Sequence, residues 1–411
     1  MEKILRDSIS KYLDENNLIK ESQHGFQHGK SCTSNMLMYW DKITQYVDKG
    51  TPVDVVYLDL SKAFDTVPHK RLIAKIRAHG IDGEVLNWIE EWLKNRRQRV
   101  VLNGEESEWM EVTSSVVQGS VLGPLCFTIY MNDMDNDVKS TLSKFADDTK
   151  VICPMKNEED RNILQNDINI LLRWAEDWQM SFNKAKCSVM HFGYANPKYT
   201  YYMGELELRH TEEEKDLGVY ITTNMKFSKQ CAESVKKANR VIGMIKRNFT
   251  NFDRDVIMML YKSLVRPHID YCVPVWRPYL KKDIKLIEGV QRRMTKLIPE
   301  LKNKTYEQRL KELNLLSIEK RHLRQDMITL YNITKGNLKI DITDIIEFVD
   351  TNTRGNTKKI RPEHTRLDVR KNSYFCRVWK TWNELSEKVV NAPTLNQFKS
   401  ELMKDGIFKG C

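Results

Sequence analysis

The sequence predicts an α+β fold, and three observations lead to that class. The apolar run at residues 55–58 has the length and β-branched content of a buried strand, and Asp59 closes it. Residues 145–148 fit a tight turn between two short strands, 142–145 and 149–153. Apolar residues at helical spacing recur along most of the remaining chain, which predicts a small sheet and a large helical part.

Taken in order, the segments alternate between helices and strands up to residue 178, and basic helices follow from residue 226. Residues 351–362 are polar, basic and contain glycine, so we expect a linker or mobile loop there. Helices are predicted at residues 1–17, 34–47, 69–79, 85–92, 124–131, 164–178, 235–247, 256–265 and 284–297, with a helical cap around Trp379, Trp382, Leu385 and Phe398. Further strands are predicted at residues 100–102 and 109–112, joined to each other by a turn.

Composition and charge narrow the class of protein. The 411 residues carry a formal net charge of +10, which favours a polyanionic partner, although an acidic membrane surface attracts the same charge. No apolar run of about 18 residues occurs, and the first ten residues are too charged for a secretory signal. We therefore expect a nuclear or cytoplasmic protein that does not contact membranes. The eight cysteines include no C-x-x-C pair, which argues against a zinc knuckle and a disulfide framework.

The turn at residues 145–148 contains two adjacent aspartates, Asp147 and Asp148. Neighbouring carboxylates repel each other unless a cation neutralises them, and hard oxygen ligands suit Mg²⁺. Asp59 is a candidate third carboxylate because it ends a buried strand. An Asp-Asp pair is also common in solvated surface turns, so the metal hypothesis depends on the rest of the sequence.

Three stretches in order resemble the successive palm motifs of reverse transcriptases, most closely those of non-LTR retrotransposons of the LINE, jockey-like type. They are DLSKAFD at 59–65, QGSVLGPL at 118–125 and FADD at 145–148. The resemblance implies a right-hand polymerase with partial fingers at 1–50, a palm with an antiparallel sheet at 51–222, a helical thumb and connector at 223–336, and a C-terminal linker and helical cap at 337–411. Residues 190–193 and 217–219 resemble the strands of the primer grip.

This resemblance implies an RNA-directed DNA polymerase, which extends a DNA primer or target 3′-end on an RNA template with deoxynucleoside triphosphates. Asp59 and Asp147 would be catalytic ligands of two Mg²⁺ ions, with Asp148 assisting and Mn²⁺ as an alternative metal. Two ions about 4 Å apart can activate the 3′-hydroxyl and stabilise the leaving pyrophosphate.

Two motifs are expected to bind the nucleotide. Phe64 matches the family position at which an aromatic ring excludes the 2′-hydroxyl, and core packing is the alternative on its apolar character alone. Gln118 and Gly119 match the second palm motif, in which a residue without a Cβ lets backbone approach the base pair or sugar closely. A plain junction between a loop and a helix is the alternative there.

Two lysines are also expected at the nucleotide. Residues 23–31 resemble a fingers motif in which Lys30 keeps the positive charge, while Gln27 replaces the usual arginine and weakens triphosphate binding. A loop that caps the helix at 34–47 is an equal alternative. Lys186 matches a palm lysine near the triphosphate and could act as a general acid toward pyrophosphate, with a solvated lysine as the alternative.

Basic residues are expected to bind nucleic acid along two thumb helices, because a row of cations can follow a phosphate backbone. Three arginines just before the hairpin at residues 100–112, Arg96, Arg97 and Arg99, either contact template or form a solvated cluster. The helix residues are Lys236, Lys237, Arg240, Arg292 and Arg293.

Two rival functions remain at this stage. Met1 lies inside what resembles a family helix, so we expect an N-terminally truncated chain with incomplete fingers. A catalytically impaired remnant that binds nucleic acid is therefore the alternative to the polymerase. A palm RNA polymerase is disfavoured by Phe64 and by the FADD turn.

Overall fold

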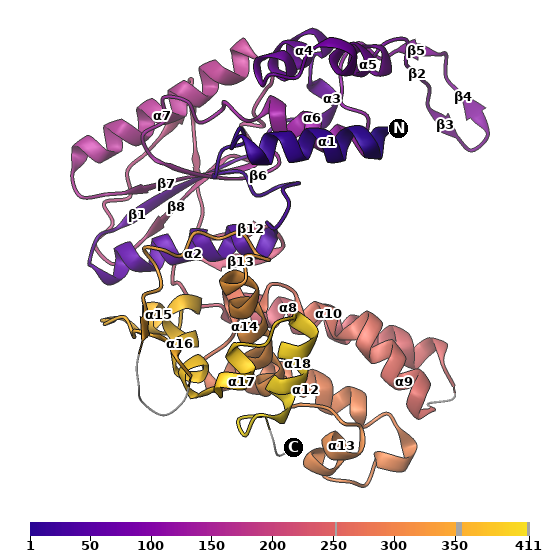
Figure 1. Cartoon of the computed structure of the whole chain (residues 1–411), viewed down its shortest axis with the longest axis vertical. Helices are drawn as coiled ribbons and strands as arrows, with labels where there is room; N and C mark the ends of the chain where they lie inside the picture. The colour runs from indigo at the N-terminus through magenta and orange to yellow at the C-terminus, as the bar shows by residue number, and fades with distance from the viewer. Residues whose placement is uncertain (251–252, 351–355, 409–411) are drawn as a thin grey trace. The chain divides into compact units, whose positions relative to one another are not determined.

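The computed structural model describes residues 1–250, 253–350 and 356–408, which group into two compact units (Figure 1). The first unit is Met1–Ser31 with Thr51–Thr211, and the second is Cys32–Gly50 with Glu212–Cys411. Both contain helices and strands, so the predicted α+β class is confirmed. The four-part division predicted from the resemblance stays a prediction, and residues 32–50 group with the second unit. No helix of the described residues has the length and apolar character needed to cross a bilayer.

A five-stranded sheet forms the centre of the first unit, in the order β11-β8-β1-β7-β6. Neighbouring strands are antiparallel except β11, which runs parallel to β8. β1 bonds to strands on both sides and all six of its residues are buried, which explains its nearly continuous apolar sequence. The strands are β1 (Val53–Leu58), β6 (Thr141–Phe145), β7 (Asp148–Pro154), β8 (Ser188–Phe192) and β11 (Arg209–His210), with a separate ribbon of β9 (Tyr202–Met203) and β10 (Leu206–Glu207).

Asp54 is the polar exception in β1, and three side chains satisfy its carboxylate. The amide of Asn196 and the hydroxyl of Tyr201 donate to it at 2.7 and 2.6 Å, and Nδ1 of His191 lies 2.7 Å away. A buried carboxylate is costly unless it is hydrogen-bonded. This cluster therefore secures the start of β1, the end opposite to Asp59.

Helices surround this sheet within the first unit. The longest, α7 (Glu158–Asp177), packs against β7 through the predicted apolar stripe and begins with a capping box of Asn157 and Asp160. The predicted helices at the N-terminus and at 69–79, 85–92 and 124–131 are confirmed. They are α1 (Glu2–Glu15), α4 (His69–Ala78), α5 (Gly83–Leu93) and α6 (Gly123–Tyr130), and a short α3 (Ala63–Thr66) precedes α4.

The hairpin before residue 112 pairs differently from the prediction. β3 (Val101–Leu102) bonds to β4 (Glu105–Glu106), whereas β5 (Met110–Glu111) bonds to β2 (Arg97–Gln98). Asn103 and Gly104, with φ of 51° and 90°, form the two-residue turn, and such a turn brings the residues directly beside it together. The predicted pairing of 100–102 with 109–112 was therefore wrong.

The second unit is mainly helical. α8 (Ser228–Asn248) packs against α12 (Lys281–Thr295), and both carry the predicted basic residues. The other helices are α2 (Cys32–Asp48), α9 (Arg254–Leu260), a π-helix (Tyr261–Val265), α10 (Pro267–Asp270), α11 (Val273–Trp276), a 3₁₀-helix (Pro299–Leu301), α13 (Tyr306–Glu312), α14 (Ile318–Thr334), α15 (Asp368–Lys371), α16 (Tyr374–Glu384), α17 (Glu387–Val390) and α18 (Leu395–Lys404).

Of the two segments predicted as strands of the primer grip, 217–219 needs correction, whereas 190–192 is confirmed as a strand. Leu217 and Gly218 form the turn between β12 (Glu213–Asp216) and β13 (Val219–Thr222) rather than part of a strand, and Leu217 has a left-handed φ of 44°. Residues 190–192 belong to β8, in the central sheet of the first unit.

The predicted linker at 351–362 is only partly described. Residues 351–355 lie outside the described residues, but β15 (Lys358–Ile360) pairs with β14 (Phe348–Asp350). Asn356 is buried, and its amide donates to the carbonyls of Trp382 and Leu385. The linker prediction was therefore wrong for the described part, because these contacts anchor it to the helical cap.

Candidate active site

Asp59 and Asp147 lie at the same end of the central sheet. Asp59 immediately follows β1, and Asp147 immediately precedes β7. Because β1 and β7 are antiparallel and Leu58 pairs with Thr149, the end of one strand coincides with the start of the other. The prediction that Asp59 ends a buried strand is confirmed.

A two-residue turn presents Asp147. Phe145 and Asp148 form the closing pair of the hairpin, so Ala146 and Asp147 are its loop residues. Ala146 has a φ of 57°, a left-handed conformation that is unusual for a residue with a Cβ. The turn at the predicted position is confirmed, and its backbone is strained at the residue before the carboxylate.

The electrostatics of the pair favour a bound cation. Burial raises the pKa of Asp147 above its ordinary value, and the negative charge of Asp59 raises it further. Oδ2 of Asp59 is closed to solvent and accepts no hydrogen bond of good geometry from the described residues, although the ammonium of Lys186 lies 2.9 Å away. Two partly buried carboxylates at the same end of the sheet fit Mg²⁺, which proteins often hold by one or two carboxylates plus substrate phosphates.

Asp148 is placed differently from the other two aspartates. It is exposed at the first position of β7, and its charge acts on Lys186. Within residues 1–250, 253–350 and 356–408, no three carboxylate, imidazole or thiol groups converge as a metal-binding set. The structure thus brings Asp59 and Asp147 together, and the assisting role of Asp148 stays a prediction.

The segment 181–187 holds Lys186 beside Asp59. The backbone N–H of Asn183 donates to the carbonyl of Asp59 at 2.7 Å, and that of Ser61 donates to the carbonyl of Ser181 at 2.8 Å. The exposed ammonium of Lys186 then reaches the Asp59 carboxylate, and this close ion pair, followed by the charge of Asp148, raises the pKa of Lys186. The predicted contact of Lys186 with the triphosphate stays a prediction.

Phe64 lies half-buried in an aromatic group. Its ring stacks on Phe127 with centroids 4.2 Å apart and meets the edge of Phe26 at 6.1 Å. Phe127 is fully buried, whereas Phe26 is half exposed. The ring of Phe64 is therefore both anchored in the core and adjacent to the surface, and its contact with the nucleotide sugar stays a prediction.

Gln118 and Gly119 form an exposed loop that is tied to the segment after Asp59. The amide of Gln118 donates to the carboxylate of Asp65 at 2.6 Å. Although Asp65 precedes α4 by only a few residues, it does not cap that helix, because Pro68 stands at the N-cap and makes no side-chain bond there. Gly119 has a φ of 79° and open space where a Cβ would stand, so its backbone conformation explains the glycine.

The ammonium of Lys30 binds groups of its own loop. Its ammonium donates to the carbonyls of Glu21 and Gln23 and to the Glu21 carboxylate at 3.0 to 3.1 Å, and its side chain is only 8% exposed. A triphosphate contact by Lys30 stays a prediction, and it would require these bonds to change.

The basic residues of the second unit lie on two packed helices. Lys236 pairs with Glu233 at 3.8 Å, and Arg293 donates to Asn239 at 3.1 Å, which links α12 to α8. Arg292 stacks over the ring of Tyr306 at 4.5 Å. Arg240 is exposed on α8 and Lys237 is partly exposed there. Their contact with nucleic acid stays a prediction.

The sheet is mostly antiparallel and carries two carboxylates at one end, with Lys186 beside them and the ring of Phe64 five residues after Asp59. This is the palm arrangement of a nucleic-acid polymerase. The chain belongs to the reverse transcriptase (RNA-dependent DNA polymerase) family, whose model matches residues 1–227, more than half of its length. The resemblance found in the sequence is therefore confirmed.

Its relatives are retrotransposon proteins. The chain is 26% identical over 309 residues to a probable RNA-directed DNA polymerase from transposon X-element of Drosophila melanogaster, and 26% identical over 322 residues to the RNA-directed DNA polymerase from mobile element jockey of Drosophila funebris. Each match covers 72% of this chain and 34% of the relative, so the chain spans about a third of their length. Among solved structures, telomerase from Candida tropicalis aligns with a TM-score of 0.46 and 10% identity over 82% of this chain and 54% of that one.

Proposed function

We propose that this chain is the RNA-directed DNA polymerase of a non-LTR retrotransposon, extending a DNA 3′-end on an RNA template with deoxynucleoside triphosphates. The observation that carries the proposal is the position of Asp59 and Asp147 at the same end of two neighbouring strands, β1 and β7, in a reverse transcriptase domain. The names of the relatives support it, since they are RNA-directed DNA polymerases of mobile elements.

Each residue has a task in this reaction. Asp59 and Asp147 would hold Mg²⁺, or Mn²⁺ in its place, and the metal would supply Lewis-acid chemistry for the 3′-hydroxyl and the leaving pyrophosphate. Lys186 is exposed beside this pair and donates a proton to the pyrophosphate. Phe64, stacked on Phe127, limits the space at the sugar and selects deoxynucleotides.

The partners follow from this chemistry. The polyanionic RNA template and DNA primer complement the net charge of +10, and α8 and α12 supply cations for their phosphates. We place the reaction in the nucleus or the cytoplasm, where a mobile element meets its RNA and its DNA target.

A second candidate function is a nucleic-acid-binding remnant that no longer polymerises. It is favoured by two observations: Gln27 stands where the fingers motif has arginine, and Lys30 is bound to Glu21 and Gln23. Capture of the triphosphate would then be weak even with both aspartates in place.

Primer extension on an RNA template with Mg²⁺ and deoxynucleotides separates the two functions. The polymerase should extend the primer, and Asp147→Asn should abolish extension while nucleic-acid binding persists. Asp137→Asn is the matched control, because Asp137 is an exposed aspartate with a φ of 64°, which asparagine tolerates. If the parent chain binds nucleic acid but extends no primer at any nucleotide concentration, the result would favour the remnant.

A further inference from the structure

The side chain of Gln23 is bonded to the turn that carries Asp147. Gln23 is 1% exposed, and its Oε1 accepts the backbone N–H of Ala146 at 2.9 Å and that of Gly25 at 2.7 Å. Its Nε2 donates to the carbonyl of Ala146 at 3.3 Å. One carboxamide therefore binds both backbone groups of the residue that precedes Asp147.

Ala146 is the residue at which this turn most needs support. Its φ of 57° is costly for a residue with a Cβ, and such a conformation persists only when the surroundings hold it in place. A buried N–H or C=O that loses its partner costs about 1–3 kcal/mol. Without Gln23, the turn would lower its free energy by rotating out of this conformation. Rotation of the peptide bond before Asp147 would move the Asp147 carboxylate away from Asp59.

Gly25 is an independent observation on the same contact. A Cβ placed on Gly25 would stand 2.2 Å from the backbone nitrogen of Ala146, and that neighbour is main chain rather than a flexible side chain. The two backbones therefore pack directly on each other, so any side chain at residue 25 displaces the turn.

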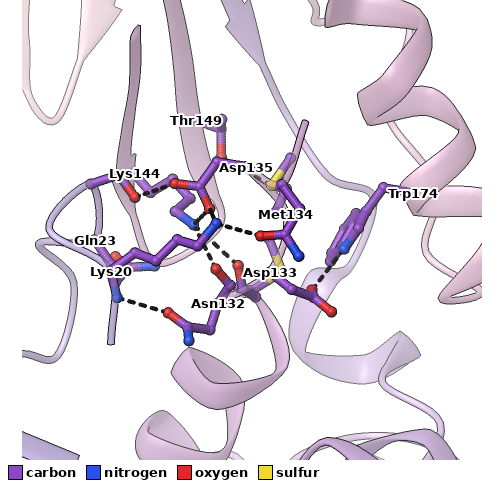
Figure 2. A network of polar contacts seen from close by, with 12 residues as sticks. Lys20, Gln23, Asn132, Asp133, Met134, Asp135, Lys144, Thr149 and Trp174 are labelled. Atoms are coloured by element: carbon purple, nitrogen blue, oxygen red, sulfur yellow. Dashed lines mark hydrogen bonds and ion pairs between the residues drawn. The ribbon is translucent and has the colours of Figure 1, made fainter. Parts of the chain in front are cut away.

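The segment around Gln23 is itself anchored to β6 (Figure 2). The N–H of Lys144 donates to the carbonyl of Ser22 at 2.8 Å, and that of His24 donates to the carbonyl of Lys144 at 2.8 Å. Asp135 accepts from the buried ammonium of Lys144 at 2.9 Å and from the hydroxyl of Ser22 at 2.6 Å. Gln23 thus extends from a segment held beside the sheet edge.

We propose that Gln23 and Gly25 are positioning residues of the polymerase site: they hold the Ala146 backbone so that Asp147 stands beside Asp59 and the pair binds a divalent cation. Neither residue touches the reacting atoms, and both act through Ala146. This inference rests on the proposed function, and it gives residues 23–25 a role toward the metal site rather than toward the triphosphate.

The test uses the full chain with Gln23→Met, which keeps the side-chain length but removes the three hydrogen bonds, and Gly25→Ala, which intrudes on Ala146. Gln230→Met is the control, because Gln230 is also buried and bonded to a backbone N–H, that of Tyr220, in the second unit. The readouts are Mn²⁺ affinity by electron paramagnetic resonance without nucleic acid, and kcat and KM for deoxynucleotide with RNA template and DNA primer.

Both site variants should bind Mn²⁺ at least about 10-fold more weakly and lose about 10²-fold in kcat, with a smaller change in KM, since a shift near 1 Å can cost that much. The control should keep both values. If folded Gln23→Met or Gly25→Ala keeps the parent's Mn²⁺ affinity and kcat, the residue has a merely structural role and the proposal is overturned. A parent chain that binds no Mn²⁺ would also overturn it. A parent that binds Mn²⁺ but extends no primer would overturn the proposed function alone, and the Mn²⁺ affinities would still decide the positioning role.

Discussion

The ammonium of Lys186 lies 2.9 Å from Oδ2 of Asp59, and backbone hydrogen bonds at Asp59 and Ser61 hold the lysine's segment there. The pair joins two motifs that are more than a hundred residues apart in the chain. A cation beside a metal-binding carboxylate is also beside the phosphates that such a metal would contact. The relationship supports the assignment of Lys186 to proton transfer and leads to the first prediction.

Lys186→Gln should lower kcat for primer extension by about 10²-fold, the usual loss for a general acid. Binding of RNA–DNA duplex should change little, because one exposed lysine among many cations contributes little to it. The measurement is single-turnover extension at saturating deoxynucleotide. Lys184→Gln, at an exposed neighbouring lysine, is the control, and equal losses in both variants would remove the catalytic assignment.

Phe64→Ala should raise the use of ribonucleotides relative to deoxynucleotides by about 10-fold to 100-fold, because steric discrimination of this kind is worth a few kcal/mol. The ratio of the two kcat/KM values is the measurement. Phe64→Tyr keeps the ring stacked on Phe127 and should keep the ratio. A ratio that does not move in the alanine variant would leave Phe64 as a core residue only.

His24 should make the first unit sensitive to acid. Burial, followed by the charges of Lys30 and Lys150, lowers the pKa of His24 to about 3 from 6.5. A histidine with a depressed folded-state pKa stabilises the fold above pH 6.5, and that stability is lost as pH falls from 6.5 toward 3 because the unfolded chain binds the proton first.

The corresponding measurement is urea unfolding at pH 7 and pH 4. The free energy of unfolding should fall between these values by about 3 kcal/mol more in the parent than in a folded His24→Gln variant. His28→Gln, at an exposed histidine four residues on, should behave as the parent does. An equal fall in the parent and His24→Gln would contradict the prediction.

Binding to an RNA–DNA duplex should weaken steeply with salt, and Lys237→Gln with Arg240→Gln should flatten the log-log slope by about 0.9 for each phosphate contact removed. Lys3→Gln with Lys11→Gln makes the same change in net charge on α1 of the first unit and is the control. Titrations at several salt concentrations provide the slopes. If the control flattens the slope and the α8 double variant does not, the phosphate-binding face lies elsewhere.

The sequence alone was sufficient to predict the helices, strands and turns that depend on the pattern of neighbouring residues. The run that ends at Asp59, the turn before Asp147 and the stripe of α7 all lie where the periodicity and the turn residues predicted them. The hairpin after Arg97 was predicted as two strands, but its pairing was wrong, because a two-residue turn at Asn103 changes which residues meet.

Only the tertiary structure decided which distant residues support the site. The sequence predicted residue 23 as part of a phosphate-binding loop, yet its carboxamide binds the Ala146 backbone, 123 positions away. The ammonium of Lys30, in the same loop, donates to the carbonyl of Gln23. Hydrophobic period and turn chemistry are properties of neighbouring residues, so a sequence displays them directly. The partner of a buried carboxamide or ammonium depends instead on which segments pack together, and that packing is established only when the whole sheet and its covering helices have formed.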